Sequence, residues 1–213
     1  MSTSVALVRL QLRKLGERPG MRAARLYSLG IFLSFGLLVL LTREPGPNEL
    51  TGLCVAALES ASWVVAGLAT WASAGPLAEE DQHDGLALLV GMHGVSPRRL
   101  AATRTFSAAL RSTLSIAAPA LGVALLGALK SGRLAWAGAL AALSVAYALS
   151  LGVTLSLLAR GLQQLFGGRA RLALLLLLLG PELLRLAEPN MPSASALFGD
   201  ALENIAALGK AFS

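Results

Sequence analysis

The residues best suited to chemistry gather in one polar segment, residues 79–104, which lies between two apolar blocks. The segment holds four acidic residues and both histidines of the chain, His83 and His93. Carboxylates and imidazoles are common metal ligands, so Glu79, Asp81 and the two histidines form a conceivable metal site. The histidines are ten residues apart, however, and no HExxH or cysteine pattern surrounds them. We therefore favour a solvated loop, and predict no metal and no cofactor.

A nucleotide-binding loop is also missing. It would read GxxxxGK followed by Ser or Thr, and the nearest stretch is LGKAF at 208–212. There Ala211 follows the lysine, and Asn204 occupies the first glycine position. No apolar block combines a nucleophile with a base. The chain is therefore not expected to be an enzyme or to hydrolyse ATP by itself.

Composition places the chain in a membrane. It has 213 residues, of which 55% are hydrophobic and 14% charged, with a mean hydropathy of +0.66. Several apolar blocks approach the roughly 20 residues that a helix needs to cross about 30 Å of hydrocarbon. The blocks lack the strict alternation of lipid-facing barrel strands, so we expect an all-α integral membrane protein. The lone Cys54 cannot form an internal disulfide, and we interpret it as a small buried residue.

The apolar pattern predicts a single membrane domain over residues 1–213, with about five transmembrane helices. An amphipathic interfacial helix over 1–20 precedes them, because GERPG at 16–20 breaks the first helical pattern. A cytoplasmic segment, 77–104, follows the second span, and an outer tail with one amphipathic helix occupies 188–213. The expected spans are residues 26–42, 51–75, 105–129, 134–158 and 172–187.

The net charge of +6 reflects the orientation of the chain in the membrane and not nucleic-acid binding. The basic residues flank apolar blocks and form no patch with aromatic residues. An amino terminus inside the cell puts 13 of the 18 Lys and Arg residues on the cytoplasmic side. We therefore expect a multi-pass inner-membrane protein with its carboxyl terminus outside. The expected cytoplasmic set is Arg9, Arg13, Lys14, Arg18, Arg22, Arg25, Arg98, Arg99, Arg104, Arg111, Arg160, Arg169 and Arg171; Arg43, Lys130, Arg133, Arg185 and Lys210 remain outside.

Two charges inside expected spans are candidates for a translocation path. Glu59 lies about 12 Å into the second span at 1.5 Å per residue, where an ionised carboxylate is costly unless it is paired or hydrated. It marks a polar pathway, a partner contact or a proton-titrating group. Alternatively it is neutral, or paired with Arg111 of the third span, and serves packing. Glu182 and Arg185, three residues apart, are expected to pair with each other as a structural feature.

The polar segment has an internal order that a generic loop lacks. Acidic residues come first, then Gly85, then the apolar stretch LALLVGM. Ser96 and Pro97 follow, with two arginines directly after them, which is typical of a helix start. This order predicts a short cytoplasmic helix, hinged by Gly85 and Gly94, that leads into the third span.

In this order the segment resembles the permease subunits of type-2 ABC exporters, among them the permease family of the cytochrome c biogenesis haem exporter. Members carry one or two acids, an Asp-Gly step, a leucine-rich segment, a proline turn and a basic residue that opens the third span. The resemblance extends to the opening amphipathic helix, the order of the spans and the length, but familiar members end with a sixth span. The matching residues are Asp81, Asp84, Gly85, Leu86, Leu88, Leu89, Ser96, Pro97 and Arg104.

The resemblance implies that residues 77–104, the coupling segment, contain a coupling helix that docks in a groove of an ATPase subunit. The chain would then be the membrane-spanning permease of an ABC exporter, with a translocation path lined by its second and fifth spans. Its expected partners are a separate ABC-type ATPase, a second permease, identical or related, and membrane lipid. The alternative is a non-transporting scaffold or immunity-type protein that recruits a cytoplasmic partner through residues 79–104. The transported substrate stays open among haem, lipid, peptide and drug.

Overall fold

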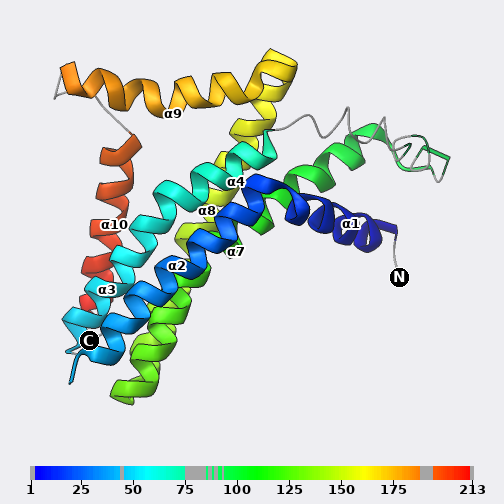
Figure 1. The fold of residues 1–213 in the computed structure, drawn as a ribbon. Coiled ribbons are helices and arrows are strands. Elements are labelled where there is room, and N and C mark those ends of the chain that lie inside the picture. Colours follow the sequence, from blue (N-terminus) through cyan, green and yellow to red (C-terminus); the bar gives the residue numbers. More distant parts are fainter. Residues whose placement is uncertain are drawn as a thin grey trace.

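The protein is an all-α membrane protein, with helices and no strands in the part of the chain that the structure describes (Figure 1). The computed structural model describes residues 3–43, 46–74, 85, 88, 91–92, 94–187 and 194–211, the backbone alone for 3–4, 180–187, 194–198 and 209–211. Four helical stretches among these residues are long and apolar enough to cross a membrane. They are Pro19–Leu41, Pro47–Ser73, Pro97–Ser131 and Leu134–Leu179.

The helices that run side by side form a bundle, and α1 lies across one of its ends (Figure 1). Helices α2 and α7 start at that end and run toward the opposite end. The continuous rod made of α3, η1 and α4 is antiparallel to them, and so is α8. The bounds are α1 Thr3–Glu17, α2 Pro19–Leu41, α3 Pro47–Ser60, η1 Ala61–Val65, α4 Ala66–Ser73, α7 Pro97–Ser131 and α8 Leu134–Phe166.

Proline sets three of the helix starts, and this explains why the helices are longer than the expected spans. Pro19, Pro47 and Pro97 each occupy the first turn of a helix, where the missing N–H costs nothing and the fixed φ favours helical geometry. The polar residues that follow them are therefore helical too. The break expected at GERPG is confirmed, since α1 ends at Glu17 and α2 begins at Pro19.

The fifth expected span, 172–187, differs from the expectation. It is helical, as most of α9 (Ala170–Ala187), but α9 runs across the bundle at the end that carries α1 (Figure 1). A short 3-10 turn, η2 (Gly167–Arg169), separates it from α8, and Gly167 there has a φ of +52°. The expected span also had only about 16 residues, fewer than the roughly 20 that cross a bilayer. The described residues thus offer four candidate spans in place of the expected five, and the fourth, Leu134–Leu179, includes the first part of α9.

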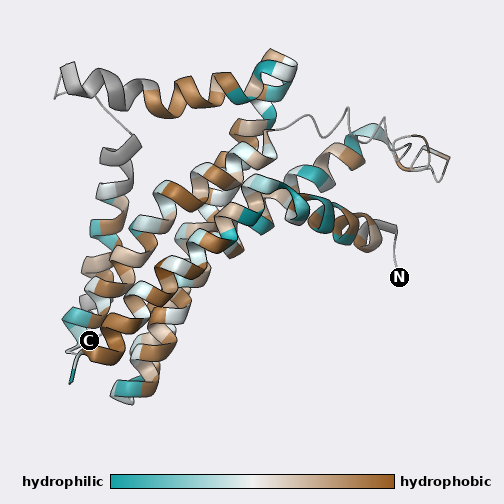
Figure 2. Ribbon diagram, in the orientation of Figure 1, coloured by the Kyte–Doolittle hydropathy of each residue, from teal (hydrophilic) through white to brown (hydrophobic). Residues whose placement is uncertain are grey.

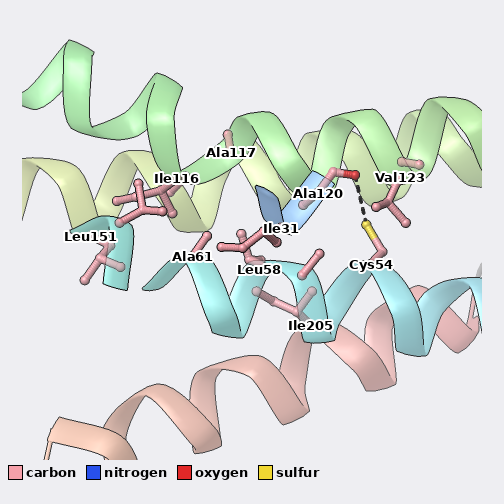
Figure 3. Packing of buried hydrophobic residues seen from close by; sticks show 14 of the residues in the cluster. Ile31, Cys54, Leu58, Ala61, Ile116, Ala117, Ala120, Val123, Leu151 and Ile205 are labelled. Carbon is pink, nitrogen blue, oxygen red and sulfur yellow. Dashed lines mark hydrogen bonds between the residues drawn. The ribbon is translucent and has the colours of Figure 1, made fainter. Parts of the chain in front are cut away.

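The tail helix α10 (Ala194–Ala211) forms as expected, but it packs along α3 with part of its length in the core (Figure 1). Leu202 and Ile205 of α10 are 3% and 8% exposed. They join a cluster centred on the α3–η1–α4 rod, which α2, α7 and α8 enclose from the other sides. Figure 3 shows Leu58 and Ala61 of the rod between α7 and Ile205. The rod is thus the central element of the fold.

The interpretation of Cys54 as a small buried residue is confirmed. Its side chain is 1% exposed and its thiol donates a hydrogen bond of 3.2 Å to the Ala120 carbonyl of α7 (Figure 3). A weak thiol donor thereby satisfies an acceptor inside the bundle. Trp136 of α8 makes a similar link, because its indole N–H donates to the Thr51 hydroxyl at 3.2 Å.

Most basic residues lie at the bundle end that carries α1 and α9, which we call the arginine-rich end (Figure 2). The start of α7 and the end of α8 contribute to it beside α1 and the start of α2. The opposite end carries Arg43, Lys130 and Arg133. The spatial separation agrees with the predicted grouping for these residues, but Arg185, predicted outside, belongs to α9 at the arginine-rich end.

Small residues allow α7 and α8 to approach closely along much of their length. A Cβ placed on Gly152 of α8 would lie 2.6 Å from the Thr113 hydroxyl and 3.1 Å from the Ala109 carbonyl oxygen. The Thr113 hydroxyl also donates to the Ala148 carbonyl at 3.3 Å. Because lipid tails are as apolar as the helices, such close packing and interhelical hydrogen bonds hold membrane helices together.

We predict that Gly152→Ala destabilises the protein by about 1–2 kcal/mol, because α7 must move or Thr113 must give up its hydrogen bond. Thermal unfolding of the purified protein in detergent measures the change. Gly138→Ala in the same helix is the matched control, since a Cβ there meets nothing within 4 Å. The control should be neutral or slightly stabilising, as alanine favours a helix by up to about 1 kcal/mol over glycine. Equal effects of the two substitutions would contradict the close α7–α8 contact.

Candidate functional site

The coupling segment is described in part. Asp81, Asp84, Leu86 and Leu89 lie outside the described residues, so their predicted contacts stay predictions. Gly85 and Gly94 both have left-handed backbone angles, with φ of +66° and +70°. Glycine adopts this region without the steric cost that a Cβ brings, which supports the expectation that chain turns lie at these two positions.

The predicted helix start at Ser96 and Pro97 is confirmed. Ser96 is the N-cap of α7, and its hydroxyl accepts a hydrogen bond of 3.3 Å from the Arg99 N–H. Pro97 occupies the first helical position. Residues 97–104, expected in the coupling segment, are therefore the first turns of α7. Helix α7 has 35 residues and connects the end of the coupling segment to the opposite end of the bundle.

The coupling segment is anchored where it joins α7. Val95 and Leu100 are buried together with Leu7 of α1. This contact fixes the first turn of α7 to the interfacial helix, which itself packs along α7 through Leu15 and Ala108. A displacement of the coupling segment would therefore be transmitted to α1 and α7 together.

Two large apolar side chains of the coupling segment point to the outside. Leu88 and Met92 are both helical and are 71% and 77% exposed. They are four residues apart in the sequence, between the glycine turns at Gly85 and Gly94. An exposed apolar pair in a polar segment is typical of a surface that binds another protein or the membrane.

Glu59 and Arg111, the candidates for the translocation path, are not brought together. Glu59 is exposed, and no ion pair joins it to Arg111 or to any other described residue. The pairing alternative is therefore wrong for the residues described. Because α3 begins at Pro47, Glu59 lies about 18 Å along the helix, near the middle of a hydrocarbon layer of roughly 30 Å.

Two features near Glu59, a π-helical turn and the Tyr147 hydroxyl, were not predicted from the sequence. The chain widens into the π-helical turn η1 directly after Ser60, and π-turns are frequent at functional sites. Ser62 of this turn is buried. Tyr147 of α8 lies close enough to Glu59 for electrostatic interaction, and its buried hydroxyl has no hydrogen-bond partner within the described part of the chain. No sequence signal marks the π-turn, and Tyr147 comes from a distant segment.

Arg111 faces a different space, a cavity of about 390 Å³ between α2 and α7. Arg25 of α2 lines the same cavity, so two guanidinium groups meet there. The end of α1 touches both, since Arg25 donates to the Gly16 carbonyl and a Cβ on Gly16 would overlap the Arg111 guanidinium. From the sequence, Arg25 was expected only to help orient the chain in the membrane.

A second, polar cavity of about 260 Å³ lies at the arginine-rich end, where α4 ends, α7 begins and α8 ends. Arg104, the expected basic residue of the third span, lines it together with Arg160 and Gln164. Arg160 donates to the Thr105 hydroxyl at 3.4 Å. The coupling segment leaves and rejoins the bundle beside this cavity. Three separate segments build it, so no local pattern predicts it.

No three potential metal-ligating side chains (His, Cys, Asp or Glu) come together among the residues that the structure describes. The conceivable ligands Glu79, Asp81, His83 and His93 lie outside them. The preference for a solvated loop over a metal centre therefore stays a prediction.

We predict that Glu59→Leu does not lower the free energy of unfolding in detergent, because the side chain is exposed, joins no ion pair with a described residue and is costly in an apolar layer when ionised. The control is Leu58→Ala at the adjacent position, whose side chain is 0% exposed. It should cost about 2–5 kcal/mol. A loss of about 3–5 kcal/mol in Glu59→Leu, as for a broken buried ion pair, would favour the packing alternative.

Comparisons of the chain with protein-family models, with curated proteins and with solved structures found no match. The positions of the residues described above are therefore what supports a function.

Proposed function

We propose that this chain is the membrane-spanning permease subunit of an ABC exporter, which couples ATP hydrolysis by a separate ATPase subunit to substrate translocation. The observation that carries the proposal is the exposed Leu88–Met92 pair, set between glycine turns at Gly85 and Gly94 and leading directly into α7. Exposed apolar side chains that lie between turns, in a segment rich in acidic residues, suit the groove of a partner subunit.

The helix that connects the coupling segment to the membrane, α7, is anchored on several neighbouring helices. Val95 and Leu100 are buried on α1, and α7 then contacts α1, α2, the α3–η1–α4 rod and α8. Closure of an ATPase pair under the coupling segment would displace this helix as a unit. Such rigid-body or hinge motion is the usual way in which a small change at one site becomes a domain movement.

The arginine-rich end is the cytoplasmic end in this proposal, as the positive-inside rule favours. It puts the amino terminus and the coupling segment in the cytoplasm of the cell and the end of α10 outside the inner membrane. The path runs between this chain and a second permease along the α3–η1–α4 rod, with Glu59 on its surface. Because α9 runs across the bundle, it does not line that path as the fifth span was expected to do.

We predict that the double substitution Asp84→Asn and Gly85→Ala uncouples the partner ATPase. The tagged full-length chain is purified from its native membrane, and the recovery and ATP hydrolysis of any co-purifying P-loop protein are measured. The substitution should lower this ATPase activity by at least about fivefold, which corresponds to the lower end of typical coupling free energies. Membrane insertion should not change, since α3, α4 and α7 keep their sequences.

The matched control is Asp200→Asn with Gly168→Ala, which removes the same charge and the same type of residue. Asp200 is exposed on α10, and a Cβ on Gly168 meets nothing within 4 Å. The control should retain full ATPase activity. Equal ATPase activity in the two double variants would contradict the coupling assignment, and recovery of a homo-oligomer without any P-loop protein would support the scaffold alternative.

A further inference from the structure

The cavity between α2 and α7 has the form of a groove with one charged end. Both helices start at the arginine-rich end and run in the same direction (Figure 1). The lining side chains follow each other at helical spacing on both helices, so the groove descends from the guanidinium groups along apolar walls. It is lined on α2 by Arg25, Ser28, Leu29 and Phe32, and on α7 by Arg111, Leu114, Ser115, Ala118, Pro119 and Gly122.

The two arginines at its head carry uncompensated charge. No carboxylate lies within 4.0 Å of Arg25 or Arg111 among the residues described. Arg25 donates to the Gly16 and Met21 carbonyls, which are neutral acceptors. The buried Nε of Arg111 has no hydrogen-bond partner in the described structure, and the two guanidinium groups are close enough to repel each other. An anion between them would remove this repulsion and accept charge-assisted hydrogen bonds.

The head of the groove adjoins the amphipathic helix α1. The last turn of α1 touches both arginines at Gly16, and α1 lies across the end of the bundle (Figure 1). An amphipathic helix in this position lies at the boundary between head groups and acyl chains. With α1 at that boundary, the guanidinium groups would be level with phospholipid phosphates.

The groove below the arginines is apolar and open to the outside. Leu29 and Leu114 are 52% and 55% exposed on its two walls. The Phe32 ring packs directly over Gly122, where a Cβ would overlap its carbon atoms. Apart from Ser28 and Ser115, the lining below the arginines is apolar, so an acyl chain entering from the bilayer meets a mainly hydrocarbon surface.

We propose that this groove binds an anionic phospholipid, with the phosphate between Arg25 and Arg111 and an acyl chain along Phe32 and Leu114. The volume of about 390 Å³ falls within the range of small-molecule sites, about 300–1,000 Å³. A two-fold contact with a second copy centred here would bring four guanidinium groups together at a high electrostatic cost. The charge of the groove therefore favours lipid over another copy of the chain, and the site requires no ATPase.

Native mass spectrometry of the full-length protein in detergent tests this site with three probes. They are dioctanoyl phosphatidylglycerol, which carries a net negative charge, dioctanoyl phosphatidylcholine, which is zwitterionic, and inorganic phosphate. We expect phosphatidylglycerol to bind at least about tenfold more tightly than phosphatidylcholine, and Arg25→Gln with Arg111→Gln to abolish this preference. The control, Arg9→Gln with Arg22→Gln, removes the same charge from exposed positions at the same end and should retain it.

A second variant keeps the test independent of the arginines and of their role in folding. Ala118→Trp fills the exposed lower groove without changing charge, and it should weaken phosphatidylglycerol binding while leaving any binding of inorganic phosphate unchanged. Three results would overturn the proposal: equal affinity of the wild type for both lipids, full competition by inorganic phosphate at equal concentration, or a protein dimer that dissociates in the double arginine variant without any lipid bound.

Discussion

Basic side chains from neighbouring helices close the carboxyl ends of several helices in this protein, and the bundle depends on these contacts. Lys130 of α7 donates to the Val39 and Leu40 carbonyls at 2.8 Å each and also to Thr42, at the end of α2. Arg18 donates to the Ala72 carbonyl at the end of α4, and Arg25 to Gly16 at the end of α1. The last carbonyls of a helix have no donor of their own and carry partial negative charge. In a bilayer they must be satisfied within the protein, so these cations fix which helix ends lie together.

The need to satisfy helix ends distinguishes two kinds of charged side chain: those that cap a helix and those that are available to bind a ligand or a partner. A lysine or arginine that caps a helix end has a use that explains its position, as Lys130 and Arg18 do. Arg111 has no such acceptor in the described structure, and Glu59 has no described cation. An unpaired charge at the depth of Glu59 is costly, and the charge of Arg111 has no carboxylate beside it among the described residues. Arg111 and Glu59 therefore have no structural partner that explains them and are available to a ligand or a partner subunit. Arg111 lies in the groove between α2 and α7, and Glu59 lies on the central rod.

Local sequence patterns predicted the helices well because each signal acts within a few residues. Pro97 after Ser96 marked the start of α7, and GERPG marked the break between α1 and α2. The direction of α9 was missed, because leucine content alone does not show that Gly167 and Gly168 turn the chain across the bundle. The burial of Leu202 and Ile205 against α3 was missed for the same reason, since Asp200 and Glu203 gave α10 the pattern of a surface helix. At the candidate sites, Arg25 meets Arg111, and Tyr147 approaches Glu59, only through tertiary packing between segments that are far apart in the sequence.

The central claim is that the coupling segment contacts an ATPase subunit through the face that carries Leu88. Site-specific photocrosslinking in the native membrane measures this directly, with the crosslinking amino acid at position 88 in the full-length chain. The control position is Leu129, which is equally exposed, at 72% against 71%, near the opposite end of α7. The account predicts an adduct with a P-loop ATPase from position 88 and none from position 129. Adducts from position 88 with lipid or with a second copy of the chain alone would contradict it.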